Sequence, residues 1–139
     1  MPVRDKIMTR FQLEKRTKNF AISVFNFIDN LPKSKASKLI AAQLLRSATS
    51  IGANYREANR AESRRDFIHK IAIVEKEAAE SLYWIELFGG VMPGDADKIQ
   101  PFWNECYHLV AIFTRIGKTS KQRLNSQSAF RNPQSESPS

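Results

Sequence analysis

The apolar residues of this chain recur every three or four positions over long stretches, and few residues interrupt that pattern. The 139 residues include only five glycines and six prolines, most of which lie in a few short segments. An interval of three to four residues is the repeat of an amphipathic α-helix, whereas half-buried strands alternate every two residues. The pattern therefore predicts an all-α protein with four helices and no strand pair.

The first two predicted helices cover residues 9–30 and 34–59. Pro32 separates them because proline disrupts a continuing helix, and Ser34 is a residue type that favours the N-cap. The second helix has two apolar faces, one with larger and one with smaller side chains, so we expect it to pack against two neighbours. These faces are Ile40, Leu44, Ile51, Tyr55 and Ala58, and then Ala41, Leu45, Ala48 and Gly52.

The third predicted helix covers residues 64–88. Ser63, with Asp66 three residues later, has the capping-box pattern with Asp in place of the usual Glu. Gly89-Gly90 is expected to end the helix. Its apolar residues follow heptad steps, which is the pattern of a helix packed lengthwise against others.

The fourth predicted helix covers residues 98–124, with Asp97 as N-cap and Pro101 in the first turn, where a missing amide costs little. Four amphipathic helices with short connections predict one domain over residues 1–124, an antiparallel up-down four-helix bundle. Residues 125–139 are rich in Ser, Asn, Gln and Pro, and we expect a disordered C-terminal tail. The apolar face of the fourth helix is predicted to comprise Phe102, Tyr107, Val110, Ala111, Phe113, Thr114 and Gly117.

Few residues indicate catalysis or metal binding. The single cysteine, Cys106, has no internal disulfide partner and no basic neighbour to activate it, so we expect a packed thiol in a cytoplasmic protein. His69 and His108 lie on different predicted helices without the Glu-x-x-His spacing of a di-metal centre. No phosphate-binding loop, signal peptide or membrane-spanning run is recognisable. We therefore expect no catalytic residue, no metal, no cofactor and no membrane association.

Carboxylates crowd the third predicted helix at positions 75, 77, 80 and 86. Paired carboxylates are typical of acid–base catalysis. On a helix surface they are more often solvated or paired with basic residues, and a contact with a basic helix of another subunit is a further alternative.

The chain is basic, with 22 Lys and Arg against 14 Asp and Glu, a net charge of +8. The first 60 residues carry all of this excess. Such a balance favours nucleic acid, an anionic membrane surface or an acidic partner. A charge that only keeps a small protein soluble is the open alternative.

The candidate binding site is a cluster of basic residues around the turn between the second and third predicted helices. Arginine side chains bind phosphate oxygens in a bidentate manner, and the free amides at a helix start favour anions. The alternative is a solvated turn whose arginines pair with Glu57, Glu62 and Asp66. The candidate residues are Arg46, Arg56, Arg60, Arg64, Arg65 and Lys70.

Three segments carry a resemblance to a known family: QLLRSATSIGANYREA at residues 43–58, SRRDF at 63–67 and IAIVEKEAAESLYW at 71–84. They resemble the bacterial four helix bundle protein family, known as products of intervening sequences inside large-subunit ribosomal RNA genes. The resemblance covers residues 20–117. The chain departs from the family pattern at Gly52, at Tyr55-Arg56 and at Ala58, where the family has glycine.

The resemblance implies a left-handed up-down bundle that forms a homo-oligomer, a pentamer, with no established enzymatic activity. The fold is similar to that of accessory proteins of diversity-generating retroelements, which engage a reverse transcriptase and nucleic acid. The family's polar signature corresponds here to Gln43, Arg46, Ser50, Asn54, Glu57 and Ser63. We expect Asn54, Glu57 and Ser63 to hold the turn between the second and third helices together through hydrogen bonds.

These observations leave two main hypotheses and a distant third. The first is a non-enzymatic oligomer that binds RNA or single-stranded DNA through phosphate contacts, without sequence specificity. The second is a scaffold that docks onto a protein partner, such as a reverse transcriptase-like enzyme, with no nucleic-acid role. The third is an enzyme.

Overall fold

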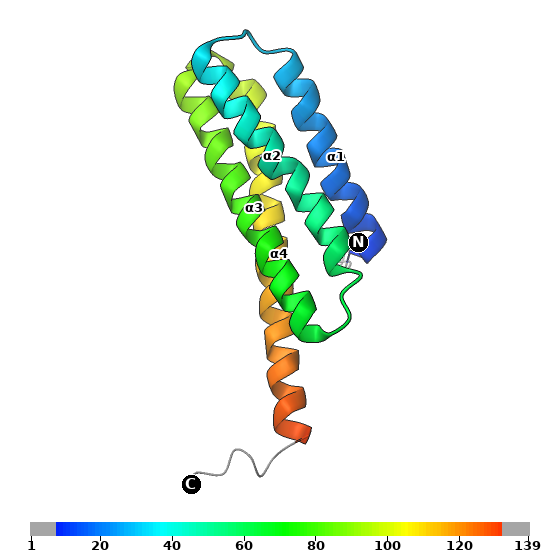
Figure 1. Cartoon of the computed structure of the whole chain (residues 1–139). Coiled ribbons are helices and arrows are strands. Elements are labelled where there is room, and N and C mark those ends of the chain that lie inside the picture. The colour runs from blue at the N-terminus through cyan, green and yellow to red at the C-terminus, as the bar shows by residue number, and fades with distance from the viewer. Residues whose placement is uncertain (1–7, 132–139) are drawn as a thin grey trace, which may run out of the picture.

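Four helices form an antiparallel bundle in the computed structural model, which describes residues 8–131 and, among them, the side chains of residues 8–128 (Figure 1). A short 3-10 helix, η1, precedes the last long helix, and residues 8–131 contain no strand. The predicted all-α four-helix bundle is confirmed. The elements are α1 (Arg10–Asp29), α2 (Lys35–Ala58), α3 (Arg64–Val91), η1 (Pro93–Asp95) and α4 (Ala96–Arg131).

Polar side chains fix the starts of the first three helices. Ser34 is the N-cap of α2, as predicted, and accepts a hydrogen bond from the Ser37 amide at 3.1 Å. Thr9 caps α1 in the same way. Ser63 caps α3 by accepting from the Asp66 amide at 3.0 Å. The four backbone amides at a helix start need partners, and these caps supply part of them.

The helices pack in a ring in which each contacts the next along the chain. α2 lies between α1 and α3, and α4 packs mainly on α3 with a smaller contact to α1. The five larger residues predicted for one α2 face are all buried. On the small-residue face, α1 comes so close that a Cβ atom at Gly52 would lie 3.1 Å from the Thr17 Oγ1 atom. The two apolar faces of α2 therefore do contact two neighbours.

The predicted junction between α3 and α4 is wrong in its details. α3 continues through Gly89 and Gly90 to Val91, because neither glycine adopts a positive φ that would turn the chain. Pro93 then begins η1. α4 starts at Ala96, so Asp97 lies in its first turn rather than at the N-cap, and Pro101 lies inside the helix.

The predicted apolar face of α4 is also wrong in part. Phe113 and Gly117 are buried, but Tyr107, Ala111 and Thr114 are exposed. The buried stripe follows a narrower line, since α4 packs mainly on one neighbour. Its members are Ile99, Cys106, Leu109, Phe113, Gly117 and Ser120.

α4 is longer than predicted at its C-terminal end and projects beyond the other helices (Figure 1). The predicted disorder is wrong for residues 125–131, which are helical. No glycine or proline lies between Gly117 and Pro133, so no residue forces the helix to stop. The rest of the predicted tail, residues 132–139, and residues 1–7 of the predicted domain lie outside the described residues. No helix within residues 8–131 is long and apolar enough to cross a lipid bilayer.

Candidate nucleic-acid interface

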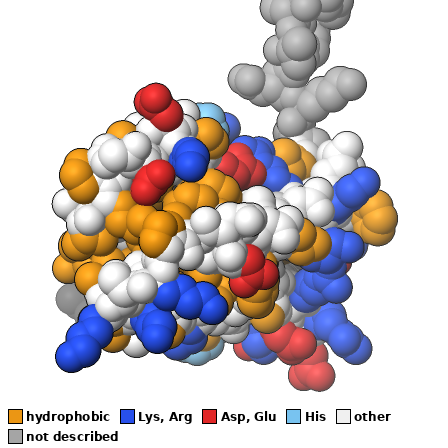
Figure 2. Space-filling model, turned by 90° about the horizontal axis from the view of Figure 1, so that it is seen from above, with side chains coloured by type: hydrophobic (Ala, Val, Ile, Leu, Met, Phe, Trp, Pro, Cys, Tyr) orange, Lys and Arg blue, Asp and Glu red, His pale blue; other side chains and the backbone are white. Residues whose placement is uncertain are grey.

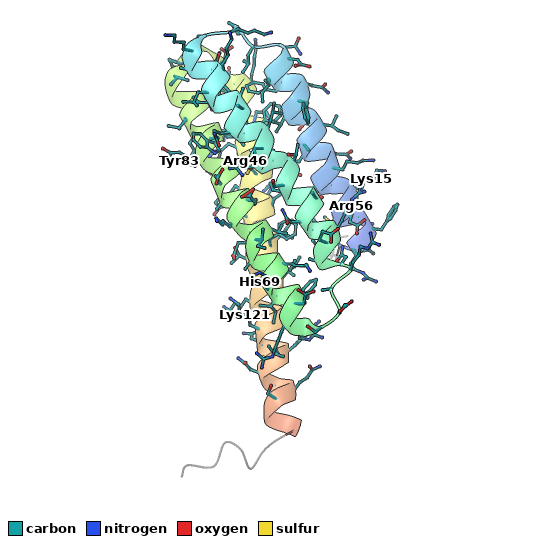
Figure 3. The ribbon with its side chains drawn as sticks, in the orientation of Figure 1. Lys15, Arg46, Arg56, His69, Tyr83 and Lys121 are labelled. Carbon is teal, nitrogen blue, oxygen red and sulfur yellow. The ribbon has the colours of Figure 1, made fainter. Side chains whose placement is uncertain are left out.

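Arg46 lies in the middle of the bundle, where it joins α2 to α3 (Figure 3). Its guanidinium pairs with Glu80 and lies 3.1 Å from the carboxylate of Glu77, whose side chain is only 11% exposed. Arg46 is ten residues, roughly 15 Å of helix, before Arg56. The structure therefore separates Arg46 from the other predicted site residues and gives it carboxylate partners of its own.

The other predicted basic residues gather around the turn between α2 and α3. Arg60 and Arg65 are exposed, Arg64 is half-buried, and none of the three has an ion pair within the described part of the chain. Arg56 Nε lies 3.9 Å from the Glu14 carboxylate of α1, and Lys70 Nζ lies 3.1 Å from Asp66. Within the described residues, none of the turn's arginines pairs with Glu57, Glu62 or Asp66 as that alternative expects, and Asp66 pairs with Lys70 instead.

Of the three residues expected to hold the turn together, only Ser63 makes a hydrogen bond there. The Asn54 side-chain Nδ2 atom donates to the Ser50 carbonyl at 2.8 Å. This bond lies within α2 itself, because Asn54 lies one turn before the helix end. The Glu57 side chain is exposed, and Ser63 acts as the N-cap of α3. A contact between helices is made instead by Asn59, whose Nδ2 atom donates to the Glu14 carboxylate of α1 at 2.9 Å. Glu14 is the residue that the sequence did not single out.

A cavity of about 630 Å³ opens at this end of the bundle, between the start of α1, the α2–α3 turn and α4. Four arginines line it, and among the residues that the structure describes no Asp or Glu does. Arg64 is the only one of the four that the sequence analysis selected. The four are Arg10, Arg64, Arg115 and Arg123.

The α4 arginines had a signal in the sequence that a coarse charge count conceals. Residues 106–131 contain five basic residues and no acidic residue. Counted over residues 93–139, this run is diluted by Asp95, Asp97, Glu105 and Glu136. A count along the helix itself would have selected Arg115 and Arg123.

Two polar side chains of the α2 end border the same cavity. Burial raises the pKa of the Tyr55 hydroxyl, and its hydrogen bond with Asn59 lowers it. The nearby negative charge of Glu14 adds to the rise, whereas the positive charge of Arg10 acts against it. The Asn59 Oδ1 atom is buried and accepts no hydrogen bond from the described residues. The cavity therefore offers cations and the Tyr55 hydroxyl group.

The opposite end of the bundle has a different surface. Figure 2 shows basic, acidic and hydrophobic side chains intermixed there. The α2–α3 end differs in its cavity, whose described lining has four arginines and no carboxylate. Lys121 and His69 of the neighbouring helices also lie at this end (Figure 3).

The residues considered for nucleophilic or metal chemistry have simple surroundings. The Cys106 Sγ atom donates to the Ala78 carbonyl at 3.3 Å, and burial raises the pKa of this thiol to about 12. The expectation of a packed thiol is confirmed. His69 and His108 are exposed, and within residues 8–131 no three His, Cys, Asp or Glu side chains are grouped so as to hold a metal ion.

The fold makes this chain a small four-helix bundle protein, with a cluster of arginines at the α2–α3 end of the bundle. The family model described as 23S rRNA-intervening sequence protein matches residues 9–115, and the chain belongs to this family. It is similar to a crystal structure described as a protein with unknown function from the S23 ribosomal protein family of Bacteroides thetaiotaomicron VPI-5482. That match has 33% sequence identity and a TM-score of 0.71, covering 78% of this chain and 97% of the other. No curated protein matches the chain.

Proposed function

We propose that this protein binds RNA or single-stranded DNA without sequence specificity, through contacts between its arginines and phosphate groups. The observation that carries the proposal is the set of arginines around the α2–α3 turn that have no carboxylate partner within the described residues. Phosphate contacts supply affinity and carry no sequence information. Arg60, Arg64 and Arg65 form the centre of the proposed interface, with Arg56 beside them.

Arg46 and Lys70 contribute less to this interface than the sequence indicates. Each would have to leave a carboxylate before it could bind a phosphate. Arg60 and Arg65 are exposed and have no such competing contact within residues 8–131. The proposed role is binding rather than catalysis.

We further propose that the chain acts as a homo-oligomer, a pentamer, so that the net charge of +8 per subunit is multiplied. Large hydrophobic side chains that are half or more exposed support self-association, with Phe11 of α1 at 77% and Leu39 of α2 at 62% exposure. Analytical ultracentrifugation of the full chain tests this, and a monomer at micromolar concentration would contradict it.

Nucleic-acid binding is tested by fluorescence anisotropy with labelled RNA and single-stranded DNA of mixed sequence. Between about 50 and 200 mM salt we expect a loss of affinity of roughly 10³-fold or more, since several phosphate contacts release counterions. The R60A/R65A variant is expected to reduce the slope of log affinity against log salt by about two, which is about one per lost phosphate contact.

The matched control is K35A/K38A, which removes the same charge from exposed positions at the other end of α2. It should leave the salt slope nearly unchanged. Equal effects of the two variants would contradict the proposed interface. No binding at low salt, together with a stable oligomer, would favour the scaffold function instead.

A further inference from the structure

The cavity at the α2–α3 end has the charge of an anion-binding site. Three of its arginines come from three separate helices: Arg10 from α1, Arg64 from α3 and Arg115 from α4. Arg123 lies two turns after Arg115, so both project from the same side of α4. Like charges repel one another, and the described lining residues include no carboxylate to offset them. An anionic ligand would supply the missing charge.

Two helix starts add to this field. Arg10 and Arg64 are the first helical residues of α1 and α3. The N-terminus of a helix carries a partial positive charge and free backbone amides. The first residues of two helices therefore contribute to the lining of the cavity. Their guanidinium groups can form paired hydrogen bonds with phosphate oxygens.

The remaining lining indicates that the anion carries an organic group. The volume of about 630 Å³ is within the range of small-molecule sites and is larger than a bare phosphate requires. Phe67 and Ile116 supply apolar surface, and Thr119 and Ser120 supply hydroxyl groups. A ligand with phosphate at one end and a ring system at the other would match both parts.

The Asn59 side chain is a fixed part of the cavity wall. Its Nδ2 atom is held by Glu14, and its Oδ1 atom is buried.

We infer that this cavity binds a nucleoside 5′-phosphate, either as a free nucleotide or as the phosphorylated 5′ end of a nucleic-acid strand. Arg64 belongs to both this cavity and the proposed interface, but Arg115 and Arg123 line only the cavity, while Arg60 and Arg65 lie outside it. Capture of one nucleotide and binding along the backbone of a strand can therefore be tested with separate variants.

The test uses the full chain, isothermal titration calorimetry and the thermal melting temperature. The probes are the four common nucleoside 5′-diphosphates, adenosine and inorganic pyrophosphate. We expect the diphosphates to bind and to raise the melting temperature, with adenosine and pyrophosphate each weaker by roughly tenfold or more. The R115A/R123A variant is expected to weaken nucleotide binding by roughly tenfold or more.

The matched control is K118A/K121A, which removes the same charge from exposed positions of the same helix that do not line the cavity. It should bind the diphosphates within about twofold of the wild type. Circular dichroism of both variants checks that the fold is retained. Equal losses in the two variants, or pyrophosphate binding as tight as that of the nucleotides, would overturn the inference.

A second comparison distinguishes the two sources of the nucleotide. An octanucleotide with a 5′-phosphate is compared with the same strand ending in a 5′-hydroxyl group. A preference of roughly tenfold that R115A/R123A abolishes identifies strand ends, whereas nucleotide binding without that preference identifies free nucleotides. If the protein shows neither nucleotide binding nor a preference for the 5′-phosphorylated strand, the inference is refuted. The R60A/R65A variant reports on backbone binding independently.

Discussion

Polar side chains in the middle of the bundle have partners within the bundle, whereas several at its α2–α3 end do not have partners among the described residues. In the middle, the buried Ser47 and Ser81 hydroxyls lie 2.8 Å apart and Cys106 donates to a carbonyl. Arg46 has two carboxylate partners there. At the end, four arginines share a cavity without a carboxylate, and the Asn59 Oδ1 atom has no donor within residues 8–131. Most buried polar groups in proteins have hydrogen-bond partners, so the unpaired groups at this end are the exception.

The largest expected effect tests whether Arg46 serves folding. Arg46→Ala would leave the mostly buried Glu77 carboxylate without its cation, so we expect a loss of about 1.5–3 kcal/mol in the free energy of unfolding. The lower half of this range applies because Arg46 itself is half-exposed. Chemical denaturation measures the effect.

A double-mutant cycle with Glu77→Ala sharpens that result. If the two groups stabilise the fold through each other, the double variant should lose less than the sum of the single variants. Additive losses would contradict the interpretation that Arg46 acts through Glu77.

The second prediction tests how well the middle of the bundle excludes water. Burial raises the pKa of Cys106 from 9.0 to about 12, so the folded chain keeps a proton that the unfolded chain loses above pH 9. Stability from this group is fully present below pH 9 and falls as pH rises toward 12, by about 1 kcal/mol between pH 9 and 10. The window ends at pH 10 because the raised pKa of Tyr55 contributes in the same direction above it.

Denaturation curves at pH 8, 9 and 10 measure this loss, and Cys106→Ala should remove most of the pH dependence. Reaction of the native thiol with iodoacetamide at pH 8 should also be slow until the chain unfolds. Rapid modification of the native protein would show that water reaches the middle of the bundle.

The smallest expected effect concerns the cavity arginines. Arg123→Ala should change the free energy of unfolding by less than about 0.5 kcal/mol, because Arg123 is exposed and has no ion pair within the described residues. The substitution also removes repulsion between like charges, so a small increase in the free energy of unfolding would fit the structure better than a decrease. Destabilisation above 1 kcal/mol would remove the contrast between the two regions.

Much of the fold could be predicted because helical periodicity is a local property. The larger α2 stripe from Ile40 to Ala58 is buried as predicted, and Ser34 caps the helix that it precedes. The predicted end of α3 was wrong because glycine permits a turn but does not require one, and Gly89 and Gly90 remain helical. The predicted apolar face of α4 was wrong in part because α4 has one main neighbour. That neighbour covers only a narrow stripe, and Tyr107 and Ala111 remain exposed outside it.

The sequence by itself determined the number of helices, their apolar faces, the excess of basic residues and the family pattern of residues 43–84. Tertiary structure alone decided which arginines meet carboxylates and which meet one another. Arg46 and Arg64 are equally basic in the sequence, but Arg46 lies against Glu77 and Glu80, while Arg64 shares a cavity with Arg10, Arg115 and Arg123. The reason is physical: periodicity sets the face of one helix, but proximity between helices depends on their packing and register.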